Sequence, residues 1–321
     1  LGEKIVENIV RTRTTISPDQ EWEKIKKQGI TVLTWEDDRY PYRLKEIAQS
    51  PPVLYVRGDL SPDDEWPVAI VGTRRATAYG RQVTDEIASS LSRSGVTIIS
   101  GMARGVDAIA HQAALNSGGR TIAVLGAGVD RIYPPEHRGL ADHIIEQGAL
   151  ISDYAPGTPP EASNFPARNR IISGLSMAVV VAEAGKRSGA LITASFAADQ
   201  GRDVFAVPGS IKSPQSRGTN RLIQDGAYLV QDPKDVLEVL SLTMLTQHRA
   251  ARVVLPTDTV EVQLFQTLGH EPMHIDEIGA RTELPIDKVT ATLALMELKG
   301  MVRQVGGMNY VAVRESQTDY E

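Results

Sequence analysis

The sequence of 321 residues contains no cysteine. This absence excludes disulfide bonds, a thiolate nucleophile and any zinc or iron–sulfur site held by cysteine. No apolar run approaches the ~18 residues that a membrane helix requires, and Leu1-Gly2-Glu3 does not open a secretory signal peptide. Aromatic residues are also few, at 5%. We therefore expect a soluble protein of the reducing cytoplasm.

The net charge of the chain is −6, from 34 Lys and Arg residues against 40 Asp and Glu residues. An acidic total argues against a nucleic-acid partner. The regions differ, however. Residues 1–66 hold 10 basic and 13 acidic side chains, residues 67–240 hold 17 and 16, and residues 241–321 hold 7 and 11. Only the central region has a positive balance.

The middle of the chain alternates between short β-branched runs and longer stretches of helical pattern. The apolar runs lie at 68–72, 96–100, 121–125, 149–153, 177–182 and 203–207. The helical stretches between them include 80–93, 105–117, 136–147 and 189–200. Apolar runs without alternation, separated by helices, are typical of parallel strands buried on both faces. We predict that residues 66–240 form an extended Rossmann-like domain of the α/β class, with a doubly wound, mostly parallel sheet.

The segments on either side of this domain have other patterns. Residues 1–65 contain a charged helical stretch at 19–28 and a proline-broken lead-in, which we interpret as part of an N-terminal helical domain. Residues 241–257 have the weak pattern of a linker. Residues 258–314 predict a winged-helix domain. Its helices are expected at 259–268, 275–281 and 286–299, and its hairpin strands at 301–305 and 310–313, with Gly306 and Gly307 in the turn.

The loops that follow the predicted strands are rich in arginine, glycine and serine. In an open parallel sheet the ligand lies beyond the carboxyl ends of the strands. Within the loop windows 73–79, 102–107, 126–135, 155–170, 185–190 and 209–221, only three side chains are acidic, whereas eleven are basic. The basic residues are Arg74, Arg75, Arg104, Arg131, Arg168, Arg170, Lys186, Arg187, Lys212, Arg217 and Arg221. Glycine and serine beside cations allow a close approach to phosphate oxygens. We predict a polyanion site at this edge of the sheet.

Several motifs that resemble cofactor or metal sites fail on closer inspection. The stretch from Gly126 to Arg131 has an arginine where a dinucleotide fingerprint needs glycine or alanine. Between His270 and His274, Pro272 interrupts the helix that a zinc motif of this spacing requires. Before Lys186, Val180 stands where a phosphate-binding Walker loop needs glycine. No nucleophile–base or acid–base pair is visible, so we predict no catalytic residue, metal or cofactor.

Aromatic and charged residues bear on how a polyanion would bind. The aromatic residues near the basic edge are Tyr79, Tyr133, Tyr154 and Phe165. So few rings favour a groove that holds the backbone, tolerates any sequence and responds to salt, over a platform of stacked bases. In the predicted winged helix, acidic residues outnumber basic ones. This excess favours a protein-contact or auxiliary role over duplex reading.

Five segments together resemble the DprA/Smf family, the DNA-processing proteins of natural transformation (competence). They are Pro51–Gly58, Ser100–His111, Phe165–Ser176, Ser188–Ala194 and Phe205–Gly209. The resemblance implies a homodimeric protein that binds and protects incoming single-stranded DNA and loads the RecA recombinase onto it, without turning over a substrate. It also implies an N-terminal domain similar to a sterile alpha motif and a C-terminal winged helix. Thr73 and Ala190 depart from the serine that is common in the family.

The resemblance assigns phosphate binding to several of the loops already singled out. The residues carried over are Arg74, Ser100, Gly101, Asn169, Arg170, Lys186, Ser188 and Gly189. The loop pattern itself adds Arg75, Arg104, Arg187, Arg217 and Asn220 to the predicted DNA site.

Two alternatives remain open. One is a nucleotide-processing enzyme of the lysine-decarboxylase-like group, whose sheet resembles this one. Those enzymes carry a Pro-Gly-Gly-x-Gly-Thr-x-x-Glu loop, whereas residues 183–190 do not have its series of glycines followed by a glutamate. The other is a transcription regulator that acts through the winged helix, which the acidic excess of that region opposes.

Overall fold

The computed structural model describes residues 16–60, 66–241, 259–268, 273–282, 284–298, 302–304 and 308–312, together with Gly2, 6–8, 10–11 and 13 near the start. The chain divides into two compact units, Leu1–Leu242 and Thr243–Glu321. Most of the predicted linker 241–257 lies outside the described residues.

The larger unit is built on a sheet with nine strands among the described residues. The strands are β1 (Thr31–Thr34), β2 (Val53–Gly58), β3 (Pro67–Gly72), β4 (Thr97–Ser100), β5 (Thr121–Val124), β6 (Ala149–Ser152), β7 (Ala178–Glu183), β8 (Asp203–Ala206) and β9 (Tyr228–Leu229). Their order across the sheet is β1-β2-β6-β5-β4-β3-β7-β8-β9. Strands β3 to β9 run parallel, whereas β1 and β2 extend one edge in antiparallel fashion.

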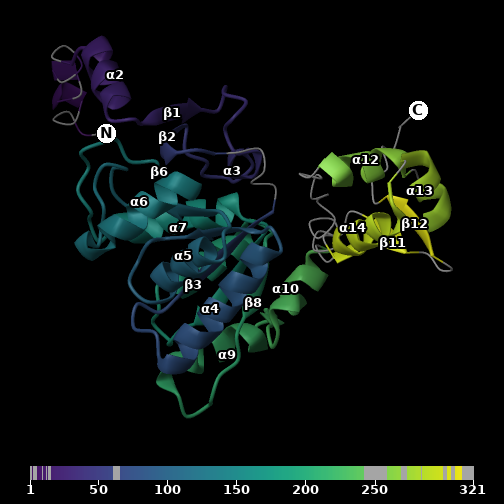
Figure 1. The fold of residues 1–321 in the computed structure, drawn as a ribbon. Coiled ribbons are helices and arrows are strands. Elements are labelled where there is room, and N and C mark those ends of the chain that lie inside the picture. Colours follow the sequence, from purple (N-terminus) through teal and green to yellow (C-terminus); the bar gives the residue numbers. More distant parts are fainter. Residues whose placement is uncertain are drawn as a thin grey trace. The chain divides into compact units, whose positions relative to one another are not determined.

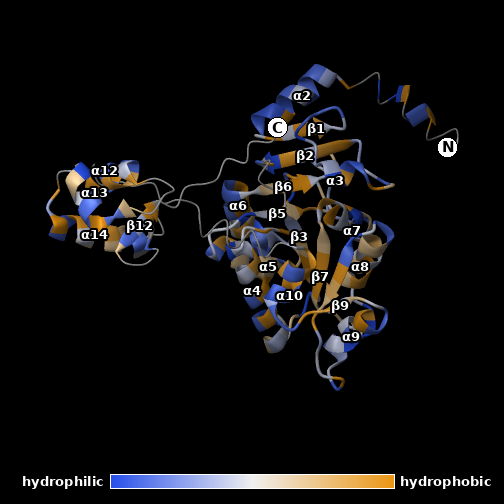
Figure 2. Cartoon of the chain, turned by 90° about the vertical axis from the view of Figure 1, so that its right-hand side faces the viewer, coloured by the Kyte–Doolittle hydropathy of each residue, from blue (hydrophilic) through white to orange (hydrophobic). Residues whose placement is uncertain are grey.

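Helices cover both faces of the sheet. They are α3 (Tyr42–Lys45), α4 (Ala78–Arg93), α5 (Val106–Asn116), α6 (Arg138–Gln147), α7 (Asn164–Leu175), α8 (Ala190–Asp199), α9 (Arg217–Gln224) and α10 (Pro233–Val239), with α2 (Pro18–Lys27) before the first strand. Figure 2 shows α4, α5 and α6 on one side of the apolar strands and α7 and α8 on the other.

Alternating strand residues divide the core between the two faces. Ile122 and Val124 of β5 pack with Ile171 of α7, whereas Ala123 of the same strand packs with Ile144 of α6. This alternation explains why the strands are apolar throughout their length. The prediction of a doubly wound, mostly parallel sheet is confirmed.

The sheet begins before residue 66, where the Rossmann-like domain was predicted to start. Leu33 of β1 and Leu54 of β2 are fully buried in the same core as the parallel strands. Pro51 and Pro52 directly precede β2, and an acidic run, residues 36–38, lies just after β1. These neighbours led us to interpret the segment as a proline-broken lead-in rather than as part of the sheet.

Two stretches interpreted as loops are helical. Residues 165–170 form the first turns of α7, and residues 217–221 open α9. Pro166 does not prevent a helix at this position because the first-turn N–H groups have no intrahelical acceptor in any case. The consequence for α7 is that its basic residues point in different directions.

The chain order of the strands creates a switch point at the centre of the sheet. From β3 the chain moves outward through β4, β5 and β6, and it then returns to β7 on the opposite side of β3. Figure 2 shows β6, β5, β3 and β7 in this order, and Figure 1 shows β6 beside β2 and β1 at the outer edge. The connections on the two sides of β3 therefore cover opposite faces of the sheet. This geometry opens a crevice at the carboxyl ends of β3 and β7.

The smaller unit has the predicted winged-helix plan. It contains α12 (Thr259–Thr267), β10 (Met273–His274), α13 (Ile275–Thr282), α14 (Ile286–Leu298), β11 (Val302–Gln304) and β12 (Asn309–Ala312). The strands pair in the order β10-β12-β11, and a separate core joins Leu264, Ile278 and Leu293. Gly306 and Gly307 of the wing turn, and residues 270–272 of the rejected zinc motif, lie outside the described residues.

Candidate nucleic-acid interface

A cleft of about 790 Å³ lies at the switch point of the larger unit. We call it the central cleft. Its walls are residues 71–75, Ala103, Asp107, Tyr133, Pro160, Ala162, Phe165, Pro166, Arg168, Asn169, Ile172, Gly185, 187–190, Ile192, Thr193 and Gln215. Four of these side chains are arginines, and Asp107 is the sole carboxylate among them. The sheet thus gathers several of the predicted loops at one site.

The loop after β3 presents two exposed arginines from a fixed backbone. Thr73 donates its N–H to the Glu183 carbonyl at 2.7 Å and accepts from Val106 N at 3.2 Å. A side chain at Gly105, whose φ is +77°, would collide with the Thr73 carbonyl, so the loop approaches α5 closely only because this residue is glycine. Arg74 and Arg75 follow directly and are exposed at the cleft.

The loop after β7 supplies the opposite wall. Buried Glu183 accepts hydrogen bonds from Thr77 N at 2.9 Å and from Thr77 Oγ1 at 2.6 Å, which ties the end of β7 to the start of α4. Beyond it, Arg187, Ser188 and Gly189 line the cleft. Ser188 donates its N–H to the Gly185 carbonyl at 3.0 Å, which closes the loop, and Gly189 is the N-cap of α8. Because glycine has no side chain, an anion can approach this helix end closely.

The floor of the cleft contains a buried charge pair that sequence reasoning missed. The Arg168 side chain is 4% exposed and Asp107 is 7% exposed. Arg168 Nη1 donates to the Gly101 carbonyl at 2.8 Å and to the Val124 carbonyl. Burial lowers the pKa of Arg168 to about 10 against the opposing effect of Asp107, whose own pKa burial raises. A Cβ at Gly101 would lie 2.7 Å from both charged groups, so glycine is required there.

A helical interpretation of residues 164–175 would have identified Arg168. Its position precedes Ile171, Ile172 and Leu175 by three, four and seven residues, and all three are buried. That spacing puts Arg168 on the inward face of α7.

Two rings and one arginine form a cluster where the cleft adjoins a smaller cavity of about 20 Å³. The ring centroids of Tyr133 and Phe165 are 5.6 Å apart, and the Arg74 guanidinium lies 5.3 Å from the centroid of Phe165. Arg104 also lines the smaller cavity, and its Nε forms an ion pair with Glu136 Oε1 at 2.6 Å. The cluster combines cations with a flat apolar surface.

Two family models match this chain. The model described as DNA recombination-mediator protein A matches residues 31–241, and the model described as the DprA winged helix domain matches residues 248–308. The chain belongs to the DprA/Smf family. It is thus related to DNA-processing proteins that mediate recombination.

Relatives and solved structures agree with this family. Protein Smf of Synechocystis sp. is 39% identical over 96% of this chain and 87% of its own length. The crystal structure of DNA processing protein A from Streptococcus pneumoniae has a TM-score of 0.66 and 41% identity, over 70% of this chain and 78% of that one. The Helicobacter pylori homologue, described for its single-stranded DNA binding mode, has a TM-score of 0.60 and 32% identity. The match covers 66% of this chain and 95% of that one.

Three residues predicted for the DNA site of this DprA/Smf protein have other contacts. Ser100 is fully buried and donates to the Ile70 carbonyl at 2.6 Å. Asn220 forms two hydrogen bonds with the backbone of Gly209, at 3.0 and 2.9 Å. Sequence cannot distinguish such inward-facing polar groups from ligand-binding ones, because both residue types serve both purposes.

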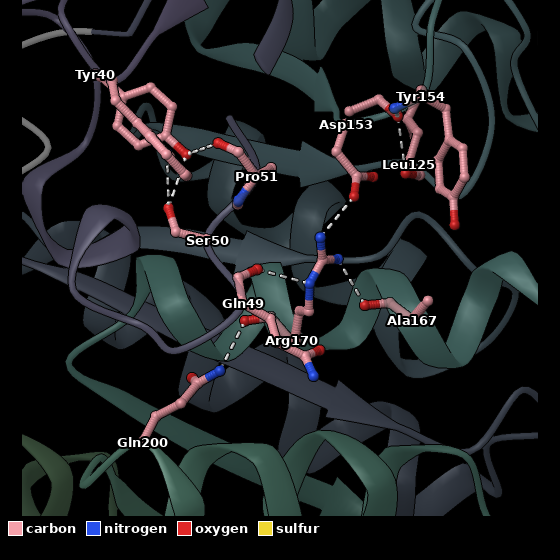
Figure 3. Close-up of polar contacts among 12 residues, drawn as sticks. Tyr40, Gln49, Ser50, Pro51, Leu125, Asp153, Tyr154, Ala167, Arg170 and Gln200 are labelled. Atoms are coloured by element: carbon pink, nitrogen blue, oxygen red, sulfur yellow. Dashed lines mark hydrogen bonds and ion pairs between the residues drawn. The ribbon is translucent and has the colours of Figure 1, made fainter. Parts of the chain in front are cut away.

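Arg170 is the third predicted DNA-site residue that has other contacts. Figure 3 shows its guanidinium between three partners: an ion pair with Asp153 at 2.8 Å and hydrogen bonds to the Gln49 and Ala167 carbonyls at 3.0 and 2.9 Å. The side chain is 15% exposed and is not among the residues that line the central cleft. It joins α7 to the segment before β2.

The remaining predicted residues divide between the cleft and its surroundings. Asn169 lines the cleft and donates to the Gly189 carbonyl at 3.4 Å, and Gly101 lines the smaller cavity. Lys186 and Arg217 are exposed beside the cleft loops but are not among its lining residues. Among the described residues there is no group of three or more side chains suited to a metal, and no helix long and apolar enough to cross a membrane.

Proposed function

We propose that this DprA/Smf protein binds single-stranded DNA in the central cleft and loads RecA onto incoming strands during natural transformation. The main support for this proposal is the set of four arginines at the switch point of a chain whose net charge is negative. The homologue from Helicobacter pylori, described for its single-stranded DNA binding mode, supports this choice of ligand. RecA as partner, a homodimeric state and a cytoplasmic location are part of the proposal because the family resemblance implies them.

The exposed guanidiniums are the groups that would hold the phosphates. Arg74 and Arg75 approach from the β3 side and Arg187 from the β7 side, so a strand lying in the cleft meets cations on both walls. Guanidinium groups bind phosphate oxygens with two parallel hydrogen bonds. The Gly189 N–H at the start of α8 and the Ser188 hydroxyl add interactions that do not depend on base identity.

The ring cluster gives the cleft a place for a base. Phe165 is half-buried against Arg74 and Tyr133, which holds its ring in one orientation. Base–aromatic stacking tolerates any base, because every base has a π-face. Phosphate binding with one stacking position fits a mediator that must accept any incoming sequence.

A binding role without turnover agrees with the state of the carboxylates. Asp107 accepts from Ala103 N at 3.3 Å and faces Arg168, and Glu183 is occupied by Thr77. A general acid or base needs a free position near the substrate. Neither group offers one.

The test is fluorescence anisotropy of a labelled oligonucleotide at several salt concentrations. We expect Arg74→Glu combined with Arg187→Glu to weaken binding more than about 100-fold, since each charge-assisted hydrogen bond contributes about 1.5–3 kcal/mol. The slope of log K against log salt should also become shallower, by about 0.7 for each phosphate that is no longer neutralised. Arg93→Glu, an exposed arginine in the last turn of α4, is the control and should leave affinity unchanged.

Unchanged affinity and salt slope in the double variant would place the DNA elsewhere. Sustained release of bases from nucleoside monophosphates by the purified protein would instead favour the nucleotide-processing alternative. The mediator role is tested by the rate at which RecA assembles on single strands, which we expect to rise when the protein is present. The homodimer is tested by the mass of the protein in sedimentation experiments.

A further inference from the structure

A second cavity, of about 370 Å³, lies beside the central cleft. We call it the serine cavity. It is lined by Thr77, Tyr79, Glu183, Gly209, Ser210, Ser213 and Ser216. These residues come from the start of α4, the end of β7 and the loop that follows β8.

The serine cavity and the central cleft share a wall. Gly185 and Gln215 line the cleft, while Glu183, Ser213 and Ser216, their near neighbours in the chain, line the cavity. A Cβ at Gly185 would lie 3.3 Å from Gln215 Oε1, so these two segments meet between the hollows. The ring cluster, the cleft and the serine cavity therefore follow one another along the carboxyl edge, in the strand order β5-β4-β3-β7-β8.

Tyr79 presents a ring to this cavity in a fixed orientation. Its side chain is 45% exposed, and its hydroxyl donates to the Pro208 carbonyl at 2.7 Å. Burial and the Glu183 carboxylate both raise the pKa of Tyr79, so the phenol stays protonated as the donor. A half-exposed aromatic ring held by its polar end is ready to stack without losing rotamer freedom.

The loop opposite the ring is also held in place. Asn220 binds the backbone N–H and carbonyl of Gly209, and a Cβ on Gly209 would collide with Ser216. Ser213 N donates to the Ser210 carbonyl at 2.9 Å. The cavity is thus a built feature with both of its walls anchored.

Charge decides which part of a nucleotide the serine cavity accepts. Its lining contains the carboxylate of Glu183 and no lysine or arginine, whereas the neighbouring cleft has four arginines. A phosphate is unfavourable beside a buried carboxylate. Hydroxyl groups and an aromatic face suit the uncharged base and sugar instead.

We propose that Tyr79 stacks a base of the strand whose phosphates occupy the central cleft, so that the DNA site extends from the ring cluster to the serine cavity. This inference rests on the proposed function. Neighbouring strands lie about 4.8 Å apart, so four strand steps from β5 to β8 span roughly 19 Å. At about 3.4 Å per stacked nucleotide, the extended site covers at most about six nucleotides.

The experiment compares Tyr79→Leu with Tyr79→Phe on oligonucleotides of about three and about twelve nucleotides. Phenylalanine keeps the ring and removes only the hydrogen bond to Pro208, whereas leucine removes both. We expect Tyr79→Leu to bind the longer oligonucleotide about five- to 100-fold more weakly and the shorter one as wild type does. Tyr79→Phe should stay within about threefold of wild type at both lengths. The control is Ile211→Ala, because Ile211 is exposed in the loop that follows β8 but lines neither the serine cavity nor the central cleft.

A second readout does not depend on the stability of the variants. Photocrosslinking of a 5-bromouracil oligonucleotide to the wild-type protein should label the peptide that contains Tyr79. Equal losses for the leucine and phenylalanine variants at both lengths would assign Tyr79 a purely structural role and overturn the inference. So would unchanged binding of the longer oligonucleotide by Tyr79→Leu, or crosslinks confined to the cleft. If wild type bound no single strand at all, the proposed function itself would fail, which is a separate result.

Discussion

Individual buried polar residues carry much of the order at the carboxyl edge of the sheet. Arg168 donates hydrogen bonds to the carbonyl of Gly101, which follows β4, and to the carbonyl of Val124, the last residue of β5. Asp107 balances its charge. Removing one member of such a pair leaves an uncompensated buried charge, which commonly costs about 3–5 kcal/mol. The position and charge of Arg168 on the cleft floor therefore depend on these three packed neighbours.

His111 is a second buried group with a defined protonation state. Its Nδ1 lies 2.6 Å from Thr121 Oγ1, and that hydroxyl already donates to the Ile98 carbonyl at 2.7 Å. Nδ1 must therefore be the donor, which leaves Nε2 unprotonated. Nε2 is buried and has no hydrogen-bond partner among the described residues. The neutral ring fits this site and the charged ring does not.

We expect stability to fall as pH decreases through the range set by His111. Burial, with the positive charges of His137 and Arg168, lowers its pKa from 6.5 to about 3. Between these values the unfolded chain binds a proton that the folded chain does not, so acidification favours unfolding by up to about 1.4 kcal/mol per pH unit. His111→Asn, which keeps a donor but does not titrate, should remove this slope.

Urea unfolding of both proteins between pH 8 and pH 4 checks the His111 prediction. Above pH 7 the difference in free energy of unfolding should be constant, because neither state is protonated there. Curves that stay parallel down to pH 4 would show that His111 does not titrate on unfolding.

At the scale of elements, α7 explains why adjacent basic residues have different roles. Arg168 points into the core and Arg170 is held by Asp153, while Asn169 between them lines the cleft. Three consecutive residues of one helical turn therefore contribute to the charged floor of the cleft, to its polar wall and to a structural ion pair. Interpreting the segment as a loop hid this division.

The contrast between Arg170 and Arg187 is testable. Arg170→Ala breaks a largely buried ion pair, so we expect about 2–3 kcal/mol of destabilisation with single-strand affinity within about twofold of wild type. Arg187→Ala removes an exposed cleft cation and should do the reverse. Its stability should change by less than about 0.5 kcal/mol, and its affinity should fall about tenfold.

Paired measurements of unfolding and anisotropy on both variants decide this. A large loss of affinity in Arg170→Ala at a temperature where the variant is fully folded would return Arg170 to the DNA site.

At the scale of the whole molecule, basic and acidic side chains are unevenly distributed along the chain. The central cleft lies entirely within the unit Leu1–Leu242, while residues 241–321 carry 7 basic and 11 acidic side chains. An acidic surface repels the DNA backbone and the resulting field depends on salt. The acidic total of the chain therefore coexists with a basic cleft.

We expect a chain that ends at Leu242 to bind single strands within about threefold of the full chain, because every cleft residue and its supporting core remain. Anisotropy at matched salt concentrations measures this. A loss of more than about tenfold would give the winged-helix unit a share of the DNA site.

Strand periodicity, helix length and motif order are local properties, so the fold class, the winged-helix plan and the family could be predicted from the residues alone. The sequence also located Arg74, Arg75, Arg187, Ser188 and Gly189 in loops that the sheet brings together. The direction of each polar side chain, in contrast, depends on tertiary packing. Ser100, Arg170 and Asn220 face inward, and Arg168 reaches the cleft floor, because burial and hydrogen bonding depend on neighbours that are distant in sequence.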